Sequence, residues 1–345
     1  MLRHVLGIFA AAAVAGPAAA VAKPQIVVID VAGAGTGLYQ GTFANGINGK
    51  NVIVGDYADS NSNYHGYLRK PDGTVTTFDV TGAGSGSQQG TQTLGINIHG
   101  DVIGFTTDAL GKYHAYIRAH DGTVTVYDID DGAPRSTIAV CINARGMVAG
   151  TYYDAHQVEH GYKRLAGGTI EIFDPPGSID TRVRAIDNGG AVAGYYEDGS
   201  GAFHGFLRDA HGKIATFDAP GAGTAPFAGT TVLSINGSGV LTGYVIDTNN
   251  IQHGFVRAKS GLITVFDPSG STGTEADAID ADDTIVGSYS DAHGNHGYLR
   301  GPDGTFTSFD GPGLILPYAI NVYGKTTGSF RDQNNVYHAF KRNGG

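Results

Sequence analysis

The sequence lacks tryptophan and has one cysteine and two methionines among its 345 residues. With Cys141 alone, no intramolecular disulfide can form, so apolar burial and backbone pairing must hold the fold together. Basic residues are also few, because 22 Lys and Arg face 32 Asp and Glu, giving a formal net charge of −10. An acidic chain lacks the basic surface that DNA, RNA or an anionic membrane requires, so we expect none of these as partners.

Long apolar runs are missing too, except near the N-terminus at residues 5–15. That run is shorter than the roughly 20 residues of a membrane-spanning helix. It follows the basic Arg3 and precedes small residues, which predicts a cleaved signal peptide over 1–22. We therefore expect a single domain over 23–345, secreted or periplasmic, without membrane insertion.

Glycine is abundant, with 55 residues interleaved with Val, Ile, Thr, Tyr and Phe, a composition typical of short strands and tight turns. One motif, His-[Gly/Ala]-[Tyr/Phe]-x-Arg, recurs along the chain at spacings of 42 to 49 residues. A fixed internal period indicates a repeat architecture. The seven copies begin at His65, His114, His160, His204, His253, His296 and His338.

Each copy has the pattern of four short strands. Segment 91–97 is typical of the first strand, 52–55 of the second and 74–79 of the fourth, and the His motif itself forms the third. Between the first two strands, every copy has a residue type that tolerates positive φ, as a hairpin turn requires. These residues are Asn51, Gly100, Gly146, Gly190, Gly239, Asp283 and Gly324. In six copies a second glycine follows the motif Arg by four residues and predicts another tight turn.

The two ends of the chain complement each other. The last copy stops at Arg342 without a fourth strand, whereas segment 25–30 has the pattern of a fourth strand with no copy of its own. A ring would use the N-terminal strand to complete the last copy and leave no exposed edge, an advantage that a linear solenoid lacks. We therefore predict an all-β, seven-bladed β-propeller of four-stranded antiparallel blades, with the last blade closed by the N-terminal strand.

The motif resembles the hallmark of the HAF-type extracellular repeat proteins, which is His-Ala-Phe or a variant of it. It stands here as His338-Ala339-Phe340 and His114-Ala115-Tyr116, with His-Gly-[Tyr/Phe] elsewhere. The resemblance covers about residues 25–345. It implies an exported β repeat protein and brings no established substrate or catalytic residues with it.

The repeated His and Asp side chains favour a structural role over metal binding. Each copy has an Asp five or six residues before its His. This Asp can accept backbone N–H bonds while the His bonds to a neighbouring strand.

Three other motifs also have structural interpretations. Residues 156–160 match the His-x-x-Glu-His zinc motif, but that motif needs a helix, and His160 begins a strand. Segment 33–37 precedes a strand rather than the helix of a phosphate-binding loop. Cys141 occupies a repeat position that elsewhere holds Gly, Ala or Ser, which predicts a small buried side chain. We expect no metal and no cofactor.

Function is expected where the copies differ. The two longer connections of each copy, between strands two and three and between successive copies, should emerge on one face, because strands alternate in direction. The first strand should lie nearest the axis, and two of its positions vary on that face. The pairs are Phe43 and Asn45, Gln92 and Leu94, Ile138 and Val140, Arg182 and Arg184, Thr231 and Leu233, Glu275 and Asp277, Leu316 and Tyr318.

The candidate ligand-binding residues come mainly from these pairs. They are Arg182, Arg184, Glu275, Asp277, Gln92, Asn45 and Tyr318, with Tyr39 in a variable loop. An ion pair between blades is an equally good interpretation of the arginines and acids. We expect a monomeric, non-catalytic propeller that binds a glycan, peptide or protein.

Two alternatives remain open. One is a carbohydrate-active enzyme, either a polysaccharide lyase or a glycoside hydrolase, acting at the mouth of the central channel. Arg182 or Arg184 would hold a substrate carboxylate, with Glu275 or Asp277 as general acid or base. The other is a purely structural surface repeat.

Overall fold

The computed structural model describes residues 26–129 and 136–343, which contain 28 strands and no helix. None of these residues forms a helix that is long and apolar enough to cross a membrane. The predicted signal peptide over 1–22 lies outside the described residues.

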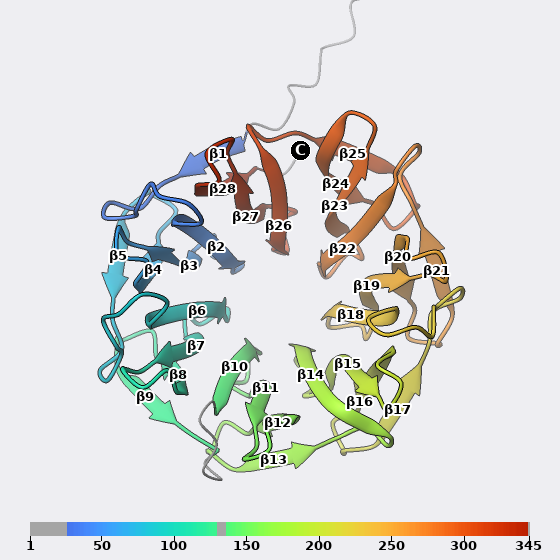
Figure 1. Cartoon of the computed structure of the whole chain (residues 1–345), viewed down its shortest axis with the longest axis horizontal. Helices are drawn as coiled ribbons and strands as arrows, with labels where there is room; N and C mark the ends of the chain where they lie inside the picture. Colours follow the sequence, from blue (N-terminus) through green and yellow to red (C-terminus); the bar gives the residue numbers. More distant parts are fainter. Residues whose placement is uncertain (1–25, 130–135, 344–345) are drawn as a thin grey trace, which may run out of the picture.

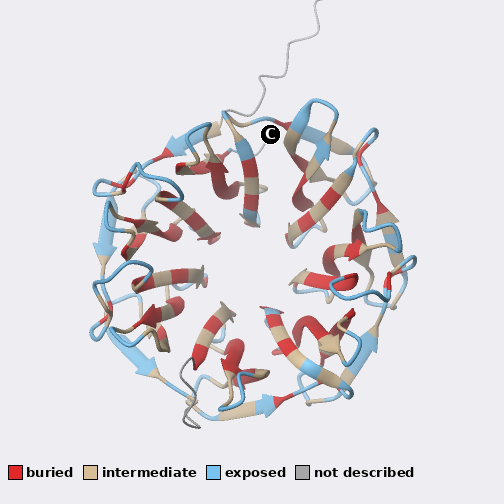
Figure 2. Cartoon of the chain, in the orientation of Figure 1, coloured by how far each residue is buried: buried red, intermediate tan, exposed pale blue. Residues whose placement is uncertain are grey.

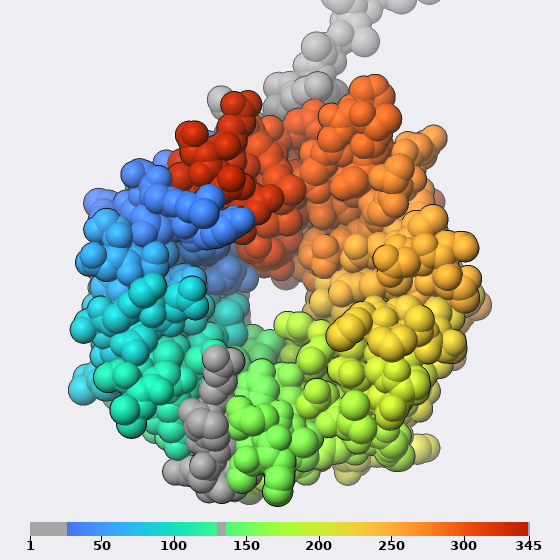
Figure 3. Space-filling view, viewed as in Figure 1, coloured from blue at the N-terminus to red at the C-terminus, as the bar shows by residue number. Residues whose placement is uncertain are grey.

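Successive strands pair in antiparallel sets of four, here called units and numbered along the chain, and 28 strands fit seven such units. The units form a ring, with the first strand of each nearest the centre (Figure 1). The space-filling view leaves an opening at the centre of this ring (Figure 3).

The first strands, called inner strands, are β2 (Gly41–Ile47), β6 (Gly90–Ile96), β10 (Thr137–Ile142), β14 (Ser178–Ile186), β18 (Gly229–Ile235), β22 (Gly273–Ile279) and β26 (Leu314–Ile320). The second strands are β3 (Ile53–Ala58), β7 (Val102–Thr107), β11 (Val148–Tyr153), β15 (Val192–Asp198), β19 (Leu241–Ile246), β23 (Ile285–Asp291) and β27 (Thr326–Arg331). The third strands, which carry the His motif, are β4 (Tyr64–Arg69), β8 (Tyr113–Arg118), β12 (Glu159–Arg164), β16 (Phe203–Arg208), β20 (Gln252–Arg257), β24 (Gly294–Arg300) and β28 (Tyr337–Arg342). The outer strands are β5 (Val75–Phe78), β9 (Val124–Tyr127), β13 (Ile170–Phe173), β17 (Ile214–Phe217), β21 (Ile263–Phe266), β25 (Phe306–Phe309) and β1 (Ile26–Ile29).

The unit of β26, β27 and β28 takes its outer strand from the start of the chain. β1 pairs antiparallel with β28, from Ile26 opposite Arg342 to Ile29 opposite Ala339. Asp30, just after β1, lies 2.8 Å from the Nδ1 atom of His338. The two ends of the described chain are therefore joined by backbone pairing and by a side-chain hydrogen bond.

The turn residues adopt the backbone conformation that their types predict. All seven residues expected between the first and second strands have positive φ, from 59° at Asn51 to 100° at Gly100. The six glycines after the motif Arg have φ between 86° and 97°. Both sets of turns are thus confirmed, which explains why strand positions follow so closely from the sequence.

Glycine also permits close contact between neighbouring units. Gly41, Gly90 and Gly229 begin inner strands, and each forms a single parallel bridge to the third strand of the preceding unit. Their φ values are 120°, 109° and 113°. A Cβ atom at any of them would collide with a backbone carbonyl of that strand, so only glycine fits.

The apolar core lies between neighbouring units rather than at one centre. One cluster joins Ala149 and Phe173 of unit 3 to Val183, Val192 and Phe206 of unit 4. Buried residues gather on the first three strands of each unit, and the outer strands are the most exposed (Figure 2).

Six of the seven motif arginines contribute to the same interfaces by stacking on an aromatic ring of the preceding outer strand, at 4.6 to 5.0 Å from the ring centre. The pairs are Arg118 with Phe78, Arg164 with Tyr127, Arg208 with Phe173, Arg257 with Phe217, Arg300 with Phe266 and Arg342 with Phe309.

Candidate functional site

The repeated His side chains form a clamp within each unit. Each His Nδ1 lies 2.6 to 2.9 Å from an Asp carboxylate that follows the outer strand. Each Nε2 faces the loop Asp of its own unit at 3.1 to 3.8 Å. The Asp, His and Asp partners are Asp59, His65 and Asp79; Asp108, His114 and Asp128; Asp154, His160 and Asp174; Asp198, His204 and Asp218; Asp247, His253 and Asp267; Asp291, His296 and Asp310; Asp332, His338 and Asp30.

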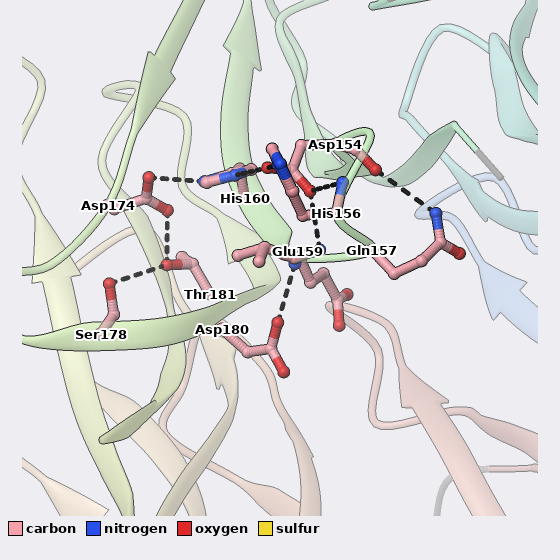
Figure 4. A network of polar contacts seen from close by, with 10 residues as sticks. Asp154, His156, Gln157, Glu159, His160, Asp174, Ser178, Asp180 and Thr181 are labelled. Atoms are coloured by element: carbon pink, nitrogen blue, oxygen red, sulfur yellow. Dashed lines mark hydrogen bonds and ion pairs between the residues drawn. The ribbon is translucent and has the colours of Figure 1, made fainter. Parts of the chain in front are cut away.

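The clamp of unit 3 contains the two histidines of the zinc-like motif (Figure 4). Asp154 accepts backbone hydrogen bonds from His156 and Val158, both at 2.8 Å. His160 binds Asp174 at 2.7 Å, whereas the His156 ring is exposed and lies 3.4 Å from Asp154. Both imidazoles therefore lie beside the Asp154 carboxylate, and Asp174 holds His160 as well, which agrees with a structural role for the repeated His and Asp. Within 26–129 and 136–343, no three His, Cys, Asp or Glu side chains are grouped as metal ligands.

Both sets of longer loops lie on one face, as expected, which we call the variable-loop face. Three loops that lead into inner strands donate a backbone hydrogen bond to the loop between the second and third strands of the preceding unit. The donors are Tyr39, Gln88 and Phe227, at 2.7 to 2.8 Å, and all three have φ between 61° and 66°. Their side chains point outward, with Phe227 69% exposed and Tyr39 54% exposed.

A cavity of about 600 Å³ lies at the end of the central channel on this face. The inner strands bring six predicted residues to its wall, namely Asn45, Arg182, Arg184, Glu275, Asp277 and Tyr318. The other two do not line it. Gln92 is half-buried on β6, and Tyr39 is on the outer rim with the Arg331 guanidinium 6.0 Å from its ring. Residues from units 1, 4, 6 and 7, which are far apart in the sequence, therefore meet at one cavity, and the units contribute different side chains to it.

Arg182 is an ion-paired side chain. Its Nε atom donates to Glu159 of the preceding unit at 3.0 Å, and Asp180 and Glu197 lie 4.0 Å from its Nη2 atom. Although burial opposes the charge, Tyr195 and Glu159 hold the pKa of Arg182 above its ordinary value. The sequence left two interpretations of the arginines open, a ligand site or an ion pair between units. Arg182 forms the ion pair.

Arg184 differs, because it forms no ion pair with the part of the chain that the structure describes. Its guanidinium donates to the Tyr195 hydroxyl at 3.1 Å and lies 5.4 Å from the Tyr195 ring centre. This cation remains available at the cavity wall.

Glu275 and Asp277 both face the cavity from β22, on either side of Ala276, where a β-bulge interrupts the regular alternation of the strand. Burial raises the pKa of Glu275, and the charge of Arg184 acts against that rise. Burial also raises the pKa of Asp277 well above its ordinary value, and the neighbouring Glu275 adds to the effect. Two carboxyl groups in such proximity retain a proton between them more readily than either would alone.

Asn45 is held in place by two hydrogen bonds from its amide nitrogen, to Asp56 at 2.9 Å and to the Thr93 carbonyl at 2.8 Å. Burial raises the pKa of Asp56 to about 7 despite the hydrogen bonds from Thr93 and Asn45. With both amide protons used, the Asn45 side-chain oxygen is left to accept a hydrogen bond from a ligand.

A further variable position, which was not among the predicted site residues, reaches the cavity. The residue after the glycine of the second strand is Asp56, Phe105, Thr151, Tyr195, Tyr244, Ser288 or Ser329. Phe105, Thr151 and Tyr244 line the cavity, as does Glu159, which precedes a motif His. The signal was present, because both positions diverge among the copies as strongly as the inner-strand pairs do.

Cys141 is half-buried on β10, deeper in the channel, where its thiol donates weakly to the Ala149 carbonyl at 3.5 Å. It is therefore less buried than the repeat position predicted. Burial nevertheless raises the pKa of its thiol to about 12, which keeps it protonated at neutral pH.

No protein-family model and no curated protein sequence matches the chain. Solved structures do match in three dimensions. The BP39L lectin of Burkholderia pseudomallei is 12% identical with a TM-score of 0.56, over 86% of this chain and 93% of the lectin. A puromycin hydrolase is also 12% identical, with a TM-score of 0.58 over 87% of this chain and 52% of that enzyme, so the chain spans about half its length. The β-propeller domain of Cps50 (Swd1) from Myceliophteria thermophila is 8% identical, with a TM-score of 0.50 over 91% of this chain and 99% of that domain. At these identities the likeness shows the fold alone, which is that of a β-propeller.

Proposed function

We propose that this chain is an exported, seven-bladed β-propeller of the HAF type, closed by β1, that binds a ligand at its variable-loop face without turning it over. The pairing of β1 with β28 supports closure, and the fit of 28 strands to seven units supports the blade number. The apolar segment at residues 5–15 supports export. We expect the protein to be a monomer.

One observation carries the binding proposal. The repeat places equivalent side chains in every unit, yet the inner-strand residues diverge where they surround a cavity of about 600 Å³. Cavities of this size are typical of ligand-binding sites. Its wall holds one exposed cation that forms no ion pair with the described residues, and two acids whose pKa values are raised by burial. Burying two neighbouring acids is costly for a purely structural repeat. A glycan, a peptide or a segment of a protein partner would fit this mixture of charged, aromatic and aliphatic groups.

Binding is tested with purified protein on glycan and peptide arrays, followed by calorimetry of the hits. Arg184→Gln and Asp277→Asn should each weaken a hit by about tenfold or more, which corresponds to about 1.4 kcal/mol. Arg145→Gln, in an exposed turn on the opposite face, is the matched control and should leave the affinity unchanged. Hits that both cavity variants retain at full affinity would contradict the location of the site, and the absence of any hit would favour a purely structural repeat.

A second candidate function, a polysaccharide lyase or glycoside hydrolase, is favoured by the raised pKa values of Glu275 and Asp277. A carboxyl group that stays protonated near neutral pH can act as a general acid. Screening anionic and neutral polysaccharides for new reducing ends and unsaturated products tests this function. Turnover that is lost in Glu275→Gln and Asp277→Asn would support it, and turnover that survives both changes would exclude this pair as the catalytic residues.

A further inference from the structure

The charges at the cavity wall follow an order around the channel. Unit 4 supplies the cation, unit 5 a hydroxyl group and unit 6 the two acids, so β18 separates the groups of opposite sign. Arg182 of unit 4 and Glu159 of unit 3 also line the cavity but are paired with each other, and the remaining wall is uncharged. In ring order, the inner-strand residues that carry this pattern are Arg184, Thr231, Leu233, Glu275, Asp277, Tyr318, Asn45, Leu94, Ile138 and Val140.

The polar groups of this wall are incompletely partnered within 26–129 and 136–343. Arg184 donates to one hydroxyl and forms no ion pair, although its guanidinium has five N–H donors. Neither the Glu275 nor the Asp277 carboxylate accepts a hydrogen bond from the described residues, and Asn45 has a free side-chain oxygen. The Arg184 guanidinium of unit 4 therefore has N–H donors left for a ligand. The two carboxylates of unit 6 and the Asn45 oxygen of unit 1 can still accept hydrogen bonds.

Thr231 and Tyr244 of unit 5 supply hydroxyl groups between the two sides. Both residues line the cavity, and the Thr231 hydroxyl faces that of Tyr244.

The inner strands on the opposite side of the cavity present aliphatic side chains. Leu94 of unit 2 and Ile138 and Val140 of unit 3 line it, beside Phe105 of unit 2 and Glu159 of unit 3, whose carboxylate is paired with Arg182. Branched aliphatic side chains pack best against another aliphatic group.

We propose that the cavity binds an amino acid or a short peptide with an aliphatic side chain. Its carboxylate would pair with Arg184, its ammonium group with Glu275 and Asp277, and its side chain would pack against Leu94, Ile138 and Val140. The inference rests on the proposed function, because it assigns a ligand class to the same site.

Two other ligand classes fit the wall less well. A polyanionic glycan would meet only one free cation, since Arg182 is already paired with Glu159, and would face the acids of unit 6. A simple organic cation would satisfy Glu275 and Asp277 but leave the Arg184 guanidinium without an anion. Only a ligand that carries both charges satisfies both sides.

Calorimetric titration with the dipeptide Leu-Leu tests the inference, with its N-acetyl and C-terminal amide derivatives as matched probes. We expect Leu-Leu to bind and each derivative to bind about tenfold or more weakly. In Arg184→Gln, which lacks the partner of the carboxylate, the C-terminal amide should bind as well as Leu-Leu. In the double variant Glu275→Gln with Asp277→Asn, which lacks the partners of the ammonium group, the N-acetyl derivative should bind as well as Leu-Leu. Arg145→Gln should behave as the wild type, and thermal midpoints of all variants establish that they are folded.

The outcomes separate this inference from the proposed function. No binding of Leu-Leu up to about 10 mM, or equal affinity for all three probes, would overturn the amino-acid inference. If an array glycan then binds and loses affinity in Arg184→Gln, the proposed binding function stands with another ligand class. If no probe of any class loses affinity in the cavity variants, both proposals fail.

Discussion

At the scale of single residues, the Asp-His-Asp clamps of His160 and His204 couple folding to pH. Although burial opposes the charge, the carboxylates of Asp174 and Asp154 raise the pKa of His160, and the same balance raises that of His204. Hydrogen bonds from Ser200 and His204 lower the pKa of Asp198 despite its partial desolvation. The clamp is therefore strongest when the His is protonated and the Asp is ionised.

The sign of the pH dependence follows for each group. A His with a raised pKa stabilises the fold fully below its unfolded pKa of about 6.5, and this contribution is lost as pH rises through the folded pKa. An Asp with a lowered pKa contributes above its unfolded value of about 3.9, and this is lost as pH falls through the folded pKa. We expect the thermal midpoint to be highest between about pH 4 and 6.5, and the alkaline decline to be shallower in His204→Gln. Parallel pH profiles for the variant and the wild type would contradict this coupling.

The stacked arginines give a second prediction. Arg342 is 1% exposed, lies 4.9 Å from the Phe309 ring centre, and has Nε and Nη1 atoms without hydrogen-bond partners among the described residues. The ring face therefore supplies much of the stabilisation of this buried cation. In urea unfolding of Phe309→Leu, Arg342→Met and the double variant, we expect a coupling free energy of about 1 to 2 kcal/mol. Additive effects of the two changes would exclude the interaction.

At the scale of elements, the turns between the first and second strands are linked by asparagine side chains. An Asn amide in one unit donates to the backbone carbonyl of the equivalent residue in the next, at 2.8 to 3.3 Å. The donors are Asn48, Asn97, Asn143, Asn236 and Asn321. Units 4 and 6 have Asp187 and Asp280 at this position, and a carboxylate has no N–H to donate, so the ring of links is interrupted twice.

Restoring one link should stabilise the protein. Asp280 is 7% exposed, and burial together with the charges of Asp282 and Asp283 raises its pKa. Asp280→Asn removes this buried charge and supplies a donor for the Asn321 carbonyl, so we expect a gain of about 1 kcal/mol in the free energy of unfolding. Asp282→Asn removes an exposed charge nearby without a new link and is the matched control. An equal gain in both variants would show that charge removal alone is responsible.

At the scale of the whole molecule, β1 has a disproportionate role because it joins the two ends of the ring. Its four residues pair with β28, and Asp30 completes the clamp of His338. Deleting residues 23–32 exposes an edge of β28 and removes the buried Ile29. We expect a lower thermal midpoint and a single cooperative transition of the entire domain.

Removal of residues 1–22 alone is the control for this deletion and should leave the midpoint unchanged. A variant lacking 23–32 that melts at the wild-type temperature would refute closure by β1. A melt in two steps would instead show that only the last unit depends on this strand.

Local chemistry allowed much of the fold to be predicted from the sequence. Asn51 and Asp283 mark hairpin turns because their side chains tolerate positive φ, and the alternation of short apolar runs sets the strands between those turns. The loop Asp and the His of each clamp also followed from spacing, because an Asp before a short loop and a His after it lie close together. The Asp after the outer strand, which contacts the His Nδ1, was not predicted. Repetition made these signals strong, since each was seen in several copies.

The candidate site depended on tertiary structure. The sequence singled out Arg182 and Arg184 equally, yet Glu159 on a strand of the preceding unit pairs with one and leaves the other free. Gln92 shares its repeat position with Arg182 but does not reach the cavity, whereas Phe105 and Tyr244 reach it from second strands. Turns and strands are fixed by interactions between residues close in the chain, which the sequence alone determines. Which side chains face the channel, and which charges are already neutralised, depends on contacts between units, and only the packing of those units decides them.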